Sequence, residues 1–219
     1  MSQLERFLDP VSVSLKICGV TVAEEAERLA DMGVHAFGVN FWSKSKRYVD
    51  PRQGQWLEAL AGRILRVGVF VNPNSEEAID LFKRGWIDVI QLHGDESPMD
   101  AAPYRDAGLP FIKAIGVSGY EQLANAREYG ANALLMDAHA PGVYGGTGDT
   151  FDWNTAIEFM SRHSEPPVIL AGGITPDNAA QAVAAVRPAA IDIASGAELS
   201  PGLKDFDKVR QLIQASQGC

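Results

Sequence analysis

The sequence predicts an α/β fold, a single (β/α)8 (TIM) barrel, on three observations. Short apolar runs that end at turn residues alternate with amphipathic helical patterns, eight times in all. Strict alternation of this kind forces parallel strands joined by right-handed crossovers. The 219 residues suit one barrel, which typically needs about 200–250. The last two predicted strands each run into glycine, as expected where a barrel binds phosphate.

The expected strands span residues 13–18, 36–41, 65–71, 88–93, 110–115, 133–137, 168–171 and 190–194. The expected helices span residues 21–32, 51–61, 75–84, 98–107, 120–129, 152–163, 178–186 and 204–215. Residues 1–12 are expected to form an irregular lead-in, so that residues 1–219 make one domain. An open doubly wound sheet is the alternative, but eight units in so short a chain favour closure.

Three helix starts carry capping signals. Thr21 fits an N-cap, and Glu24 three residues later completes a capping box. Ser75 fits the N-cap of the third helix. Thr175 fits an N-cap with Pro176 at the first helical position, where the missing N–H costs nothing.

Composition and charge narrow the function. The chain is 46% apolar and 21% charged, which is ordinary for a globular protein. Its net charge of −9 without a long basic run argues against a nucleic-acid role. No run approaches the roughly 18 apolar residues of a membrane helix, and no signal peptide is visible. The two cysteines, Cys18 and Cys219, are too few for a disulfide framework, so we expect a cytoplasmic protein.

A phosphate site is expected where the last two strands end. Gly172 and Gly173 follow the strand at 168–171, and without a Cβ they let a ligand approach the backbone. A helix N-terminus comes next, which presents N–H groups and a positive dipole end to an anion. Ser195 and Gly196 follow the next strand. Two neighbouring strand ends of this kind can hold one phosphate between them.

The other polar residues at predicted strand ends are candidates for chemistry, because barrel active sites lie there. They are Lys16, Cys18, Asn40, Arg47, Gln91, His93, Lys113, Asp137 and Asp192. Lys16 and Cys18 lie two apart in one strand and therefore share a face. The ammonium is expected to lower the pKa of Cys18 towards neutrality and so to favour a thiolate. The open alternative is that Cys18 is a small buried hydrophobe.

Three charged candidates allow two interpretations each. Asp137 is a loop ligand or N-cap, or else a proton donor in a dry site. Asp192 lies between two isoleucines and is expected to be buried, where it would hold Lys16 or Lys113. Arg47 follows two lysines and is either a solvated loop charge or the partner of a planar carboxylate.

The glycine-rich run Gly145-Gly146-Thr147-Gly148 is either a flexible loop or a hinged lid over the site. It is not a P-loop, because no Lys-Ser/Thr pair follows it. The four histidines are scattered, so no metal site is expected. Lys113 would suit a Schiff base, but nothing local favours one.

Short motifs occur in order along nearly the whole chain. They are KICGVT at 16–21, Phe41 with SKSKRYV at 43–49, VFVN at 69–72, IQLHGDE at 90–96, GGTG at 145–148 before FDW at 151–153, LAGG at 170–173, and SGAE at 195–198 with PGLKD at 201–205. Together they resemble the phosphoribosylanthranilate isomerase family of tryptophan biosynthesis. Each motif alone is weak, but the ordered set is highly specific.

This resemblance implies an Amadori rearrangement, an aldose-to-ketose isomerisation that needs no cofactor. It implies that Cys18 is the general base, that Asp137 is the general acid and that Arg47 holds the anthranilate carboxylate. It places the phosphate at Gly172, Gly173, Ser195 and Gly196. We expect the remaining substrate contacts at Lys16, Gln91, His93 and Asp192. Ala194 stands where the family often has a second serine, which puts one hydroxyl contact to the phosphate in doubt.

The alternatives share the scaffold. The histidine-pathway isomerase performs the same chemistry with two aspartates, and Cys18 argues against it. Indole-glycerol-phosphate synthase would need more lysine and glutamate at the strand ends. A non-catalytic phosphometabolite-binding barrel would keep the glycines but has no need of Cys18 with Asp137. The expected partner is a small phosphorylated substrate, and both a monomer and a homodimer stay open.

Overall fold

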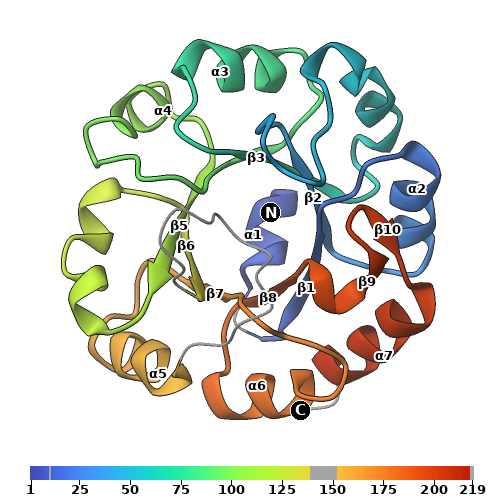
Figure 1. The fold of residues 1–219 in the computed structure, drawn as a ribbon. Helices are drawn as coiled ribbons and strands as arrows, with labels where there is room; N and C mark the ends of the chain where they lie inside the picture. The colour runs from blue at the N-terminus through green and yellow to red at the C-terminus, as the bar shows by residue number, and fades with distance from the viewer. Residues whose placement is uncertain (10, 139–151, 218–219) are drawn as a thin grey trace.

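The computed structural model describes residues 1–9, 11–138 and 152–217 and confirms the predicted barrel (Figure 1). Eight parallel strands pair in chain order. They are β1 (Ser14–Cys18), β2 (Ala36–Asn40), β3 (Leu65–Phe70), β4 (Val89–Leu92), β5 (Phe111–Val117), β6 (Ala133–Ala138), β7 (Val168–Leu170) and β8 (Ala190–Ile193). The open sheet is excluded, because β1 pairs with both β2 and β8.

Helical segments α2 to α7 and η1 to η3 surround the sheet (Figure 1). The α-helices are α1 (Gln3–Phe7), α2 (Ala23–Asp31), α3 (Ser75–Lys83), α4 (Ala102–Asp106), α5 (Trp153–Arg162), α6 (Ala179–Val186) and α7 (Phe206–Gln217). The 3₁₀ segments are η1 (Pro51–Leu60), η2 (Tyr120–Leu123), η3 (Ala126–Tyr129) and η4 (Ser195–Ala197). A hairpin of β9 (Glu198–Ser200) and β10 (Leu203–Lys204) follows β8. Across the described ranges, no helix has the length and apolarity that crossing a membrane requires.

Two apolar cores lie on the two faces of the sheet. The outer core packs the strands against the helices and includes Leu15 and Ile17 of β1. The inner core fills the barrel and includes Val67 of β3 and Ile169 of β7. Because both faces of the sheet are buried, the strands are almost continuously apolar, as parallel strands commonly are.

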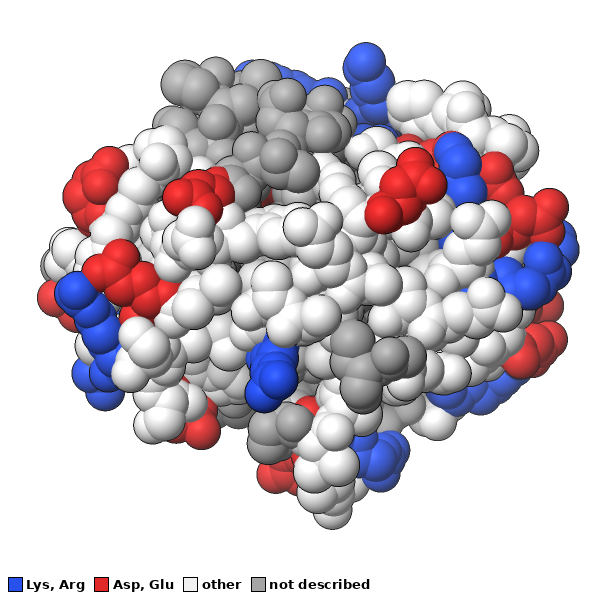
Figure 2. Space-filling model, turned by 90° about the horizontal axis from the view of Figure 1, so that it is seen from below, with Lys and Arg blue, Asp and Glu red and all other residues white. Residues whose placement is uncertain are grey.

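The flank of the barrel that carries α6 is poor in charge. Figure 2 shows this flank, with most acidic and basic side chains lying around its edges. The sequence of α6, AAQAVAAV, contains no charged residue.

The lead-in that the sequence predicts to be irregular contains a short helix, α1 (Gln3–Phe7). α1 begins with a capping box, in which Ser2 Oγ accepts from the N–H of Glu5 (3.1 Å) and the Glu5 carboxylate accepts from the N–H of Ser2 (2.6 Å). Phe7 is buried in the inner core, with Leu4 and Leu8 packed against that core. A helix of five residues is too short to give a helical periodicity, so the capping box was its only signal in the sequence.

Two predicted helix caps are wrong for tertiary and local reasons. The hydroxyl of Thr21 donates to the carbonyl of Gly202 at 3.0 Å, and Val22 takes the N-cap position of α2. Asn74, rather than Ser75, caps α3, with its Oδ1 accepting the N–H two residues on at 3.2 Å. A side chain that can cap a helix is thus drawn away when a distant segment offers it a partner.

The predicted helices at 51–61 and 120–129 are 3₁₀ segments instead. Side chains at i and i+3 eclipse in a 3₁₀ helix. Leu57 and Leu60 stand three apart and are both fully buried. Leu123 and Ala126, also three apart, are buried in the same way across η2 and η3. A spacing of three residues therefore places the buried side chains of these short segments on one face.

Candidate active site

A buried ion pair joins β1 and β8 inside the barrel. Lys16 and Asp192 are partners in the strand register, and Lys16 Nζ donates to Asp192 Oδ2 at 2.8 Å. Their side chains are 0% and 6% exposed. The other carboxylate oxygen, Asp192 Oδ1, is buried and has no hydrogen-bond partner among the described residues. An unpaired buried acceptor costs free energy, so this oxygen would gain from a hydroxyl of a ligand.

Lys113 lies on the other face of the sheet, which answers the question left open for Asp192. Its strand neighbours Ile112 and Ala114 belong to the inner core, so its own side chain points outwards. Lys113 Nζ donates to Glu96 Oε2 at 2.6 Å and to the carbonyl of Gly94 at 2.7 Å. Lys113 is therefore not a residue of the barrel mouth, although it was a candidate in the sequence.

Cys18 shares the inner face with Lys16, as predicted, and Gly38 of β2 leaves room for both. A Cβ built on Gly38 would lie 2.8 Å from Cys18 Sγ and 3.1 Å from Lys16 Nζ. Real Cβ atoms essentially never approach a neighbour under 3.0 Å, so a side chain at Gly38 would displace Cys18. Gly38 was not among the predicted site residues, since a glycine inside a strand carries no chemical signal.

Burial dominates the electrostatics of Cys18. Burial raises the pKa of the Cys18 thiol, Lys16 lowers that pKa, and Asp192 raises it further, so the pKa lies above its ordinary value. Burial also disfavours the Lys16 ammonium, but Asp192 and Cys18 outweigh it and raise the pKa of Lys16. The expectation that Lys16 brings the pKa of Cys18 towards neutrality is therefore wrong. Lys16 lowers the pKa of Cys18 as expected, but desolvation of the thiol raises that pKa by more, and the Lys16 ammonium is also paired with Asp192.

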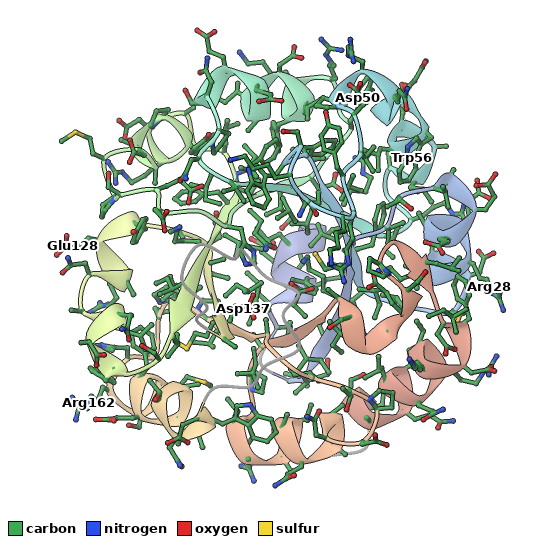
Figure 3. The ribbon with its side chains drawn as sticks, in the orientation of Figure 1. Arg28, Asp50, Trp56, Glu128, Asp137 and Arg162 are labelled. Atoms are coloured by element: carbon green, nitrogen blue, oxygen red, sulfur yellow. The ribbon has the colours of Figure 1, made fainter. Side chains whose placement is uncertain are left out.

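Asp137 lies near the end of β6 within the ring of strands, where Figure 3 labels it. Its Oδ1 accepts the N–H of Ala138 at 2.9 Å, and its Oδ2 lies 3.2 Å from His93 Nε2. Gly172 lies against the carboxylate, because a Cβ built there would be 3.0 Å from Asp137 Oδ1. Asp137 thus has a backbone partner of its own and also meets an imidazole and one of the predicted phosphate-site glycines.

Gln91 and His93, predicted to contact substrate, form a chain with Asp137. Gln91 Nε2 lies 2.8 Å from His93 Nδ1. Gln91 Oε1 is buried without a hydrogen-bond partner in the described ranges. Hydrogen-bonding side chains therefore connect β4 and β6 near their carboxyl-terminal ends, inside the barrel.

The two predicted phosphate loops contact one another. Gly172 and Gly173 have φ angles of +82° and +61°, a conformation that L side chains rarely adopt. A Cβ on Gly196 would collide with the carbonyl oxygen of Ile174. Ser195, beside Gly196, is exposed. The loop after β8 therefore lies directly against the loop after β7.

The start of α6 differs from the prediction of Thr175 as N-cap. The helix begins at Ala179, with Asn178 at the N-cap position. Asn178 Oδ1 accepts the N–H of Thr175 at 2.8 Å, and its Nδ2 donates to the carbonyl of Gly173 at 3.0 Å. Pro176 consequently lies in a turn that precedes the helix. The Asn178 side chain holds the glycine loop through its hydrogen bond to the Gly173 carbonyl.

Arg47 is not a solvated loop charge. Its side chain is 13% exposed, and it donates from Nε to Glu198 Oε1 (2.8 Å) and from Nη2 to Glu198 Oε2 (2.6 Å). Lys204 Nζ donates to the same Glu198 Oε1 at 2.7 Å and to the carbonyl of Cys18 at 2.6 Å. We call Arg47, Glu198 and Lys204 the ionic cluster. It contains two cations and one anion beside the end of β1.

The pKa of each member of the ionic cluster is shifted by its neighbours in the cluster. The hydrogen bonds to Glu198 raise the pKa of Arg47. Burial opposes ionisation of Glu198, but Arg47 and Lys204 outweigh it and lower the pKa of Glu198. Burial lowers the pKa of Lys204, and the attraction of Glu198 offsets this only in part. Glu198 and Lys204 were quoted only as parts of motifs, because nothing local in the sequence shows that they meet Arg47.

The predicted lid, residues 145–148, lies outside the described residues. Within the ranges that the structure does describe, no group of three or more His, Cys, Asp or Glu side chains is placed to hold a metal ion.

The fold and these groups define a class of protein: a TIM barrel with ionisable side chains at the inner strand ends and glycine loops after the last two strands. Comparison with known proteins narrows that class. The model of the N-(5'-phosphoribosyl)anthranilate (PRA) isomerase family matches residues 15–215. The chain belongs to this family.

Individual relatives agree over almost the full length. The chain is 41% identical over 207 residues to N-(5'-phosphoribosyl)anthranilate isomerase of Citrifermentans bemidjiense, covering 91% of this chain and 94% of the relative. A crystal structure of phosphoribosyl anthranilate isomerase from Thermotoga maritima is similar with a TM-score of 0.85 and 34% identity, covering 94% of this chain and all of the other. A structure of the isomerase in complex with reduced 1-(o-carboxyphenylamino)-1-deoxyribulose 5-phosphate has a TM-score of 0.81 and 33% identity, with coverage of 94% and 100%.

Proposed function

We propose that this chain converts N-(5'-phosphoribosyl)anthranilate to 1-(o-carboxyphenylamino)-1-deoxyribulose 5-phosphate in tryptophan biosynthesis, with Cys18 as general base and Asp137 as general acid. Family membership supports the reaction. The observation that carries the site is the packing of Gly172 against Asp137, which puts the glycine loops next to a carboxyl on the inner face. A sugar phosphate held at the loops would therefore have its ring beside Asp137.

The reaction requires two proton transfers. Asp137 gives a proton to the furanose ring oxygen, the bond from that oxygen to C1′ breaks, and an iminium forms between C1′ and the anthranilate nitrogen. Cys18 as thiolate then takes the proton from C2′, and the electron pair neutralises the iminium to give an enolamine. Tautomerisation of the enolamine at C1′ and C2′ gives the ketone. The residues end with their protons exchanged, and solvent restores the starting state.

The neighbouring residues suit this division of roles. Lys16 favours the Cys18 thiolate, although burial raises the pKa of the thiol. The unpaired Asp192 Oδ1 is an acceptor for a ribose hydroxyl. His93 fixes the orientation of the Asp137 carboxyl through its Nε2.

Arg47 is proposed to bind the anthranilate carboxylate, and the glycine loops are proposed to bind the phosphate. A guanidinium has five N–H donors, of which the Glu198 contact uses two. The phosphate would meet backbone N–H groups near Gly173 and Gly196, with the start of α6 adding its dipole. We further propose a monomer or homodimer that acts in the cytoplasm, in keeping with the composition.

A fluorescence assay tests the proposal. Phosphoribosylanthranilate carries the anthranilate fluorophore, whose emission falls on turnover. The purified chain should quench it catalytically, and the Asp137→Asn variant should not. A stable fluorescence signal with the wild-type chain would show that it does not isomerise this substrate and would overturn the proposal.

A further inference from the structure

The ionic cluster fixes one edge of Arg47 and leaves another free. Glu198 takes the edge formed by Nε and Nη2 in a bidentate contact. The edge formed by Nη1 and the second N–H of Nη2 has no hydrogen-bond partner among the described residues. That free edge has the fork geometry that a second planar carboxylate can accept.

The stem of Arg47 is fixed as well. Gly19, which follows Cys18, has a φ of +79°, and a Cβ built there would collide with Arg47 Cδ. The side chain therefore crosses the backbone directly after β1 before it reaches Glu198. With the stem held at Gly19 and one guanidinium edge held at Glu198, the direction of the free edge is determined.

Glu198 itself is held rigidly by its hairpin. Its side chain is 3% exposed, and Oε1 also accepts the N–H of Gly202 at 3.2 Å. Lys208 Nζ donates to the carbonyl of Glu198 at 2.8 Å. Lys204, at the other strand of the hairpin, donates to the Cys18 carbonyl. The hairpin thus ties the free edge of Arg47 to the strand end that bears Cys18.

The charge of the ionic cluster favours one more anion. One carboxylate faces two cations, so the cluster keeps one unit of positive charge in a mostly buried place. A neutral ring in place of a carboxylate-bearing ring would leave the free donors of Arg47 without an acceptor.

We propose that Glu198 is a positioning residue that makes this site selective for substrates whose aromatic ring carries a carboxylate. Glu198 does not touch the substrate. It holds Arg47 so that the free guanidinium edge meets the carboxylate while C2′ lies at Cys18. The inference rests on the proposed function and adds a determinant of specificity to it.

The experiment compares two ligands that differ only in the carboxylate. They are reduced 1-(o-carboxyphenylamino)-1-deoxyribulose 5-phosphate and its phenylamino counterpart, with dissociation constants measured by calorimetry. Wild type should prefer the carboxylate-bearing ligand by about 30-fold or more, as expected for a desolvated ion pair. Glu198→Gln, which is isosteric but neutral, should reduce this preference about tenfold by misplacing Arg47 and leave the phenylamino ligand unaffected. Glu198→Asp, which keeps the charge on a shorter stem, should fall between the two.

Glu96→Gln is the matched control, since Glu96 is also a buried glutamate bound to a lysine but lies on the outer face. Thermal melts should show that this variant is folded, and its preference for the carboxylate-bearing ligand should equal that of wild type. Equal weakening of both ligands in Glu198→Gln would make Glu198 a purely structural residue and overturn the inference. If wild type binds neither ligand, the proposed function itself fails. If wild type binds both equally, the inference fails together with the proposed role of Arg47, whereas the proposed reaction and its acid–base pair stand.

Discussion

Two buried lysine–carboxylate pairs lie on opposite faces of the same sheet, and they are used differently. On the outer face, Glu96 accepts from Lys113 and from the N–H groups of Asn72 and Gly94, so both of its oxygens have partners. On the inner face, Asp192 accepts from Lys16 through one oxygen only and leaves Oδ1 unpaired. A saturated pair stabilises the fold, whereas an unsaturated one keeps an acceptor for a ligand.

The largest expected effects come from breaking each pair. Glu96→Gln leaves the Lys113 ammonium buried without its counter-ion, which should lower the free energy of unfolding by about 3–5 kcal/mol. Its kcat should change little. Asp192→Asn also leaves a buried ammonium, Lys16, without its counter-ion, so it should lose stability too, but it alone should lower kcat/KM strongly as well. Denaturant unfolding and steady-state kinetics on both variants check this, and a matching pattern in the two would remove the distinction between the faces.

The next prediction concerns the reacting pair on the inner face. Cys18→Ala and Asp137→Asn should each lower kcat by at least about 100-fold, with KM changed far less, because each removes one proton transfer. Single-turnover kinetics under saturating substrate measure the effect directly. A Cys18→Ala variant with near-normal kcat would make Cys18 a packing residue.

Two glycines sharpen the comparison at a smaller scale. Gly38→Ala on the inner face should displace Cys18 and lower kcat about tenfold. Gly68→Ala is its counterpart, because a Cβ there would lie 2.9 Å from Ile87 and Phe70 in the outer core. That variant should lose about 1–3 kcal/mol of stability with normal kcat. A Gly38→Ala enzyme of normal kcat would show that Cys18 need not stay where it is.

The smallest effect is a dependence of stability on alkaline pH. Since the pKa of Cys18 is raised in the folded state, the unfolded chain loses its thiol proton first. The free energy of unfolding should therefore fall as pH rises from the ordinary cysteine pKa through the higher folded value. In a Cys219→Ser background, the fall should be shallower in Cys18→Ala, because Tyr104 and Tyr129, whose pKa values are also raised, contribute the remainder. An identical slope in the two proteins would contradict the raised pKa.

The strands and the closure of the barrel were predictable, because apolar runs bounded by glycine mark buried parallel strands without any tertiary knowledge. The helical layer was less so. Thr21 and Ser75 are residue types that commonly cap helices. The Thr21 hydroxyl, however, donates to Gly202, 181 residues away, and the N-cap position next to Ser75 is occupied by Asn74. Local propensity decides a cap only where no better partner competes.

The candidate site was predictable where strand position alone fixes a side chain. Lys16 and Cys18 share the inner face because they are two apart, and Asp192 meets Lys16 through the register. The face of Lys113 could not be read from its strand, since apolar residues occupy both alternating sets from Phe111 to Val117. Glu198 was beyond reach for another reason, as its partner Arg47 is 151 residues distant.

The short N-terminal helix has a consequence for synthesis on the ribosome. Phe7 precedes all eight strands of the barrel in the chain, but it packs in the inner core with residues from strands as late as Ala190 of β8. One edge of β1 also stays unpaired until β8 has been made, since β1 pairs with β8. A nascent chain thus carries an uncovered aromatic residue and an open strand edge until the last strand emerges, and both invite association with other chains. Both features are covered only once β8 has left the exit tunnel and paired with β1.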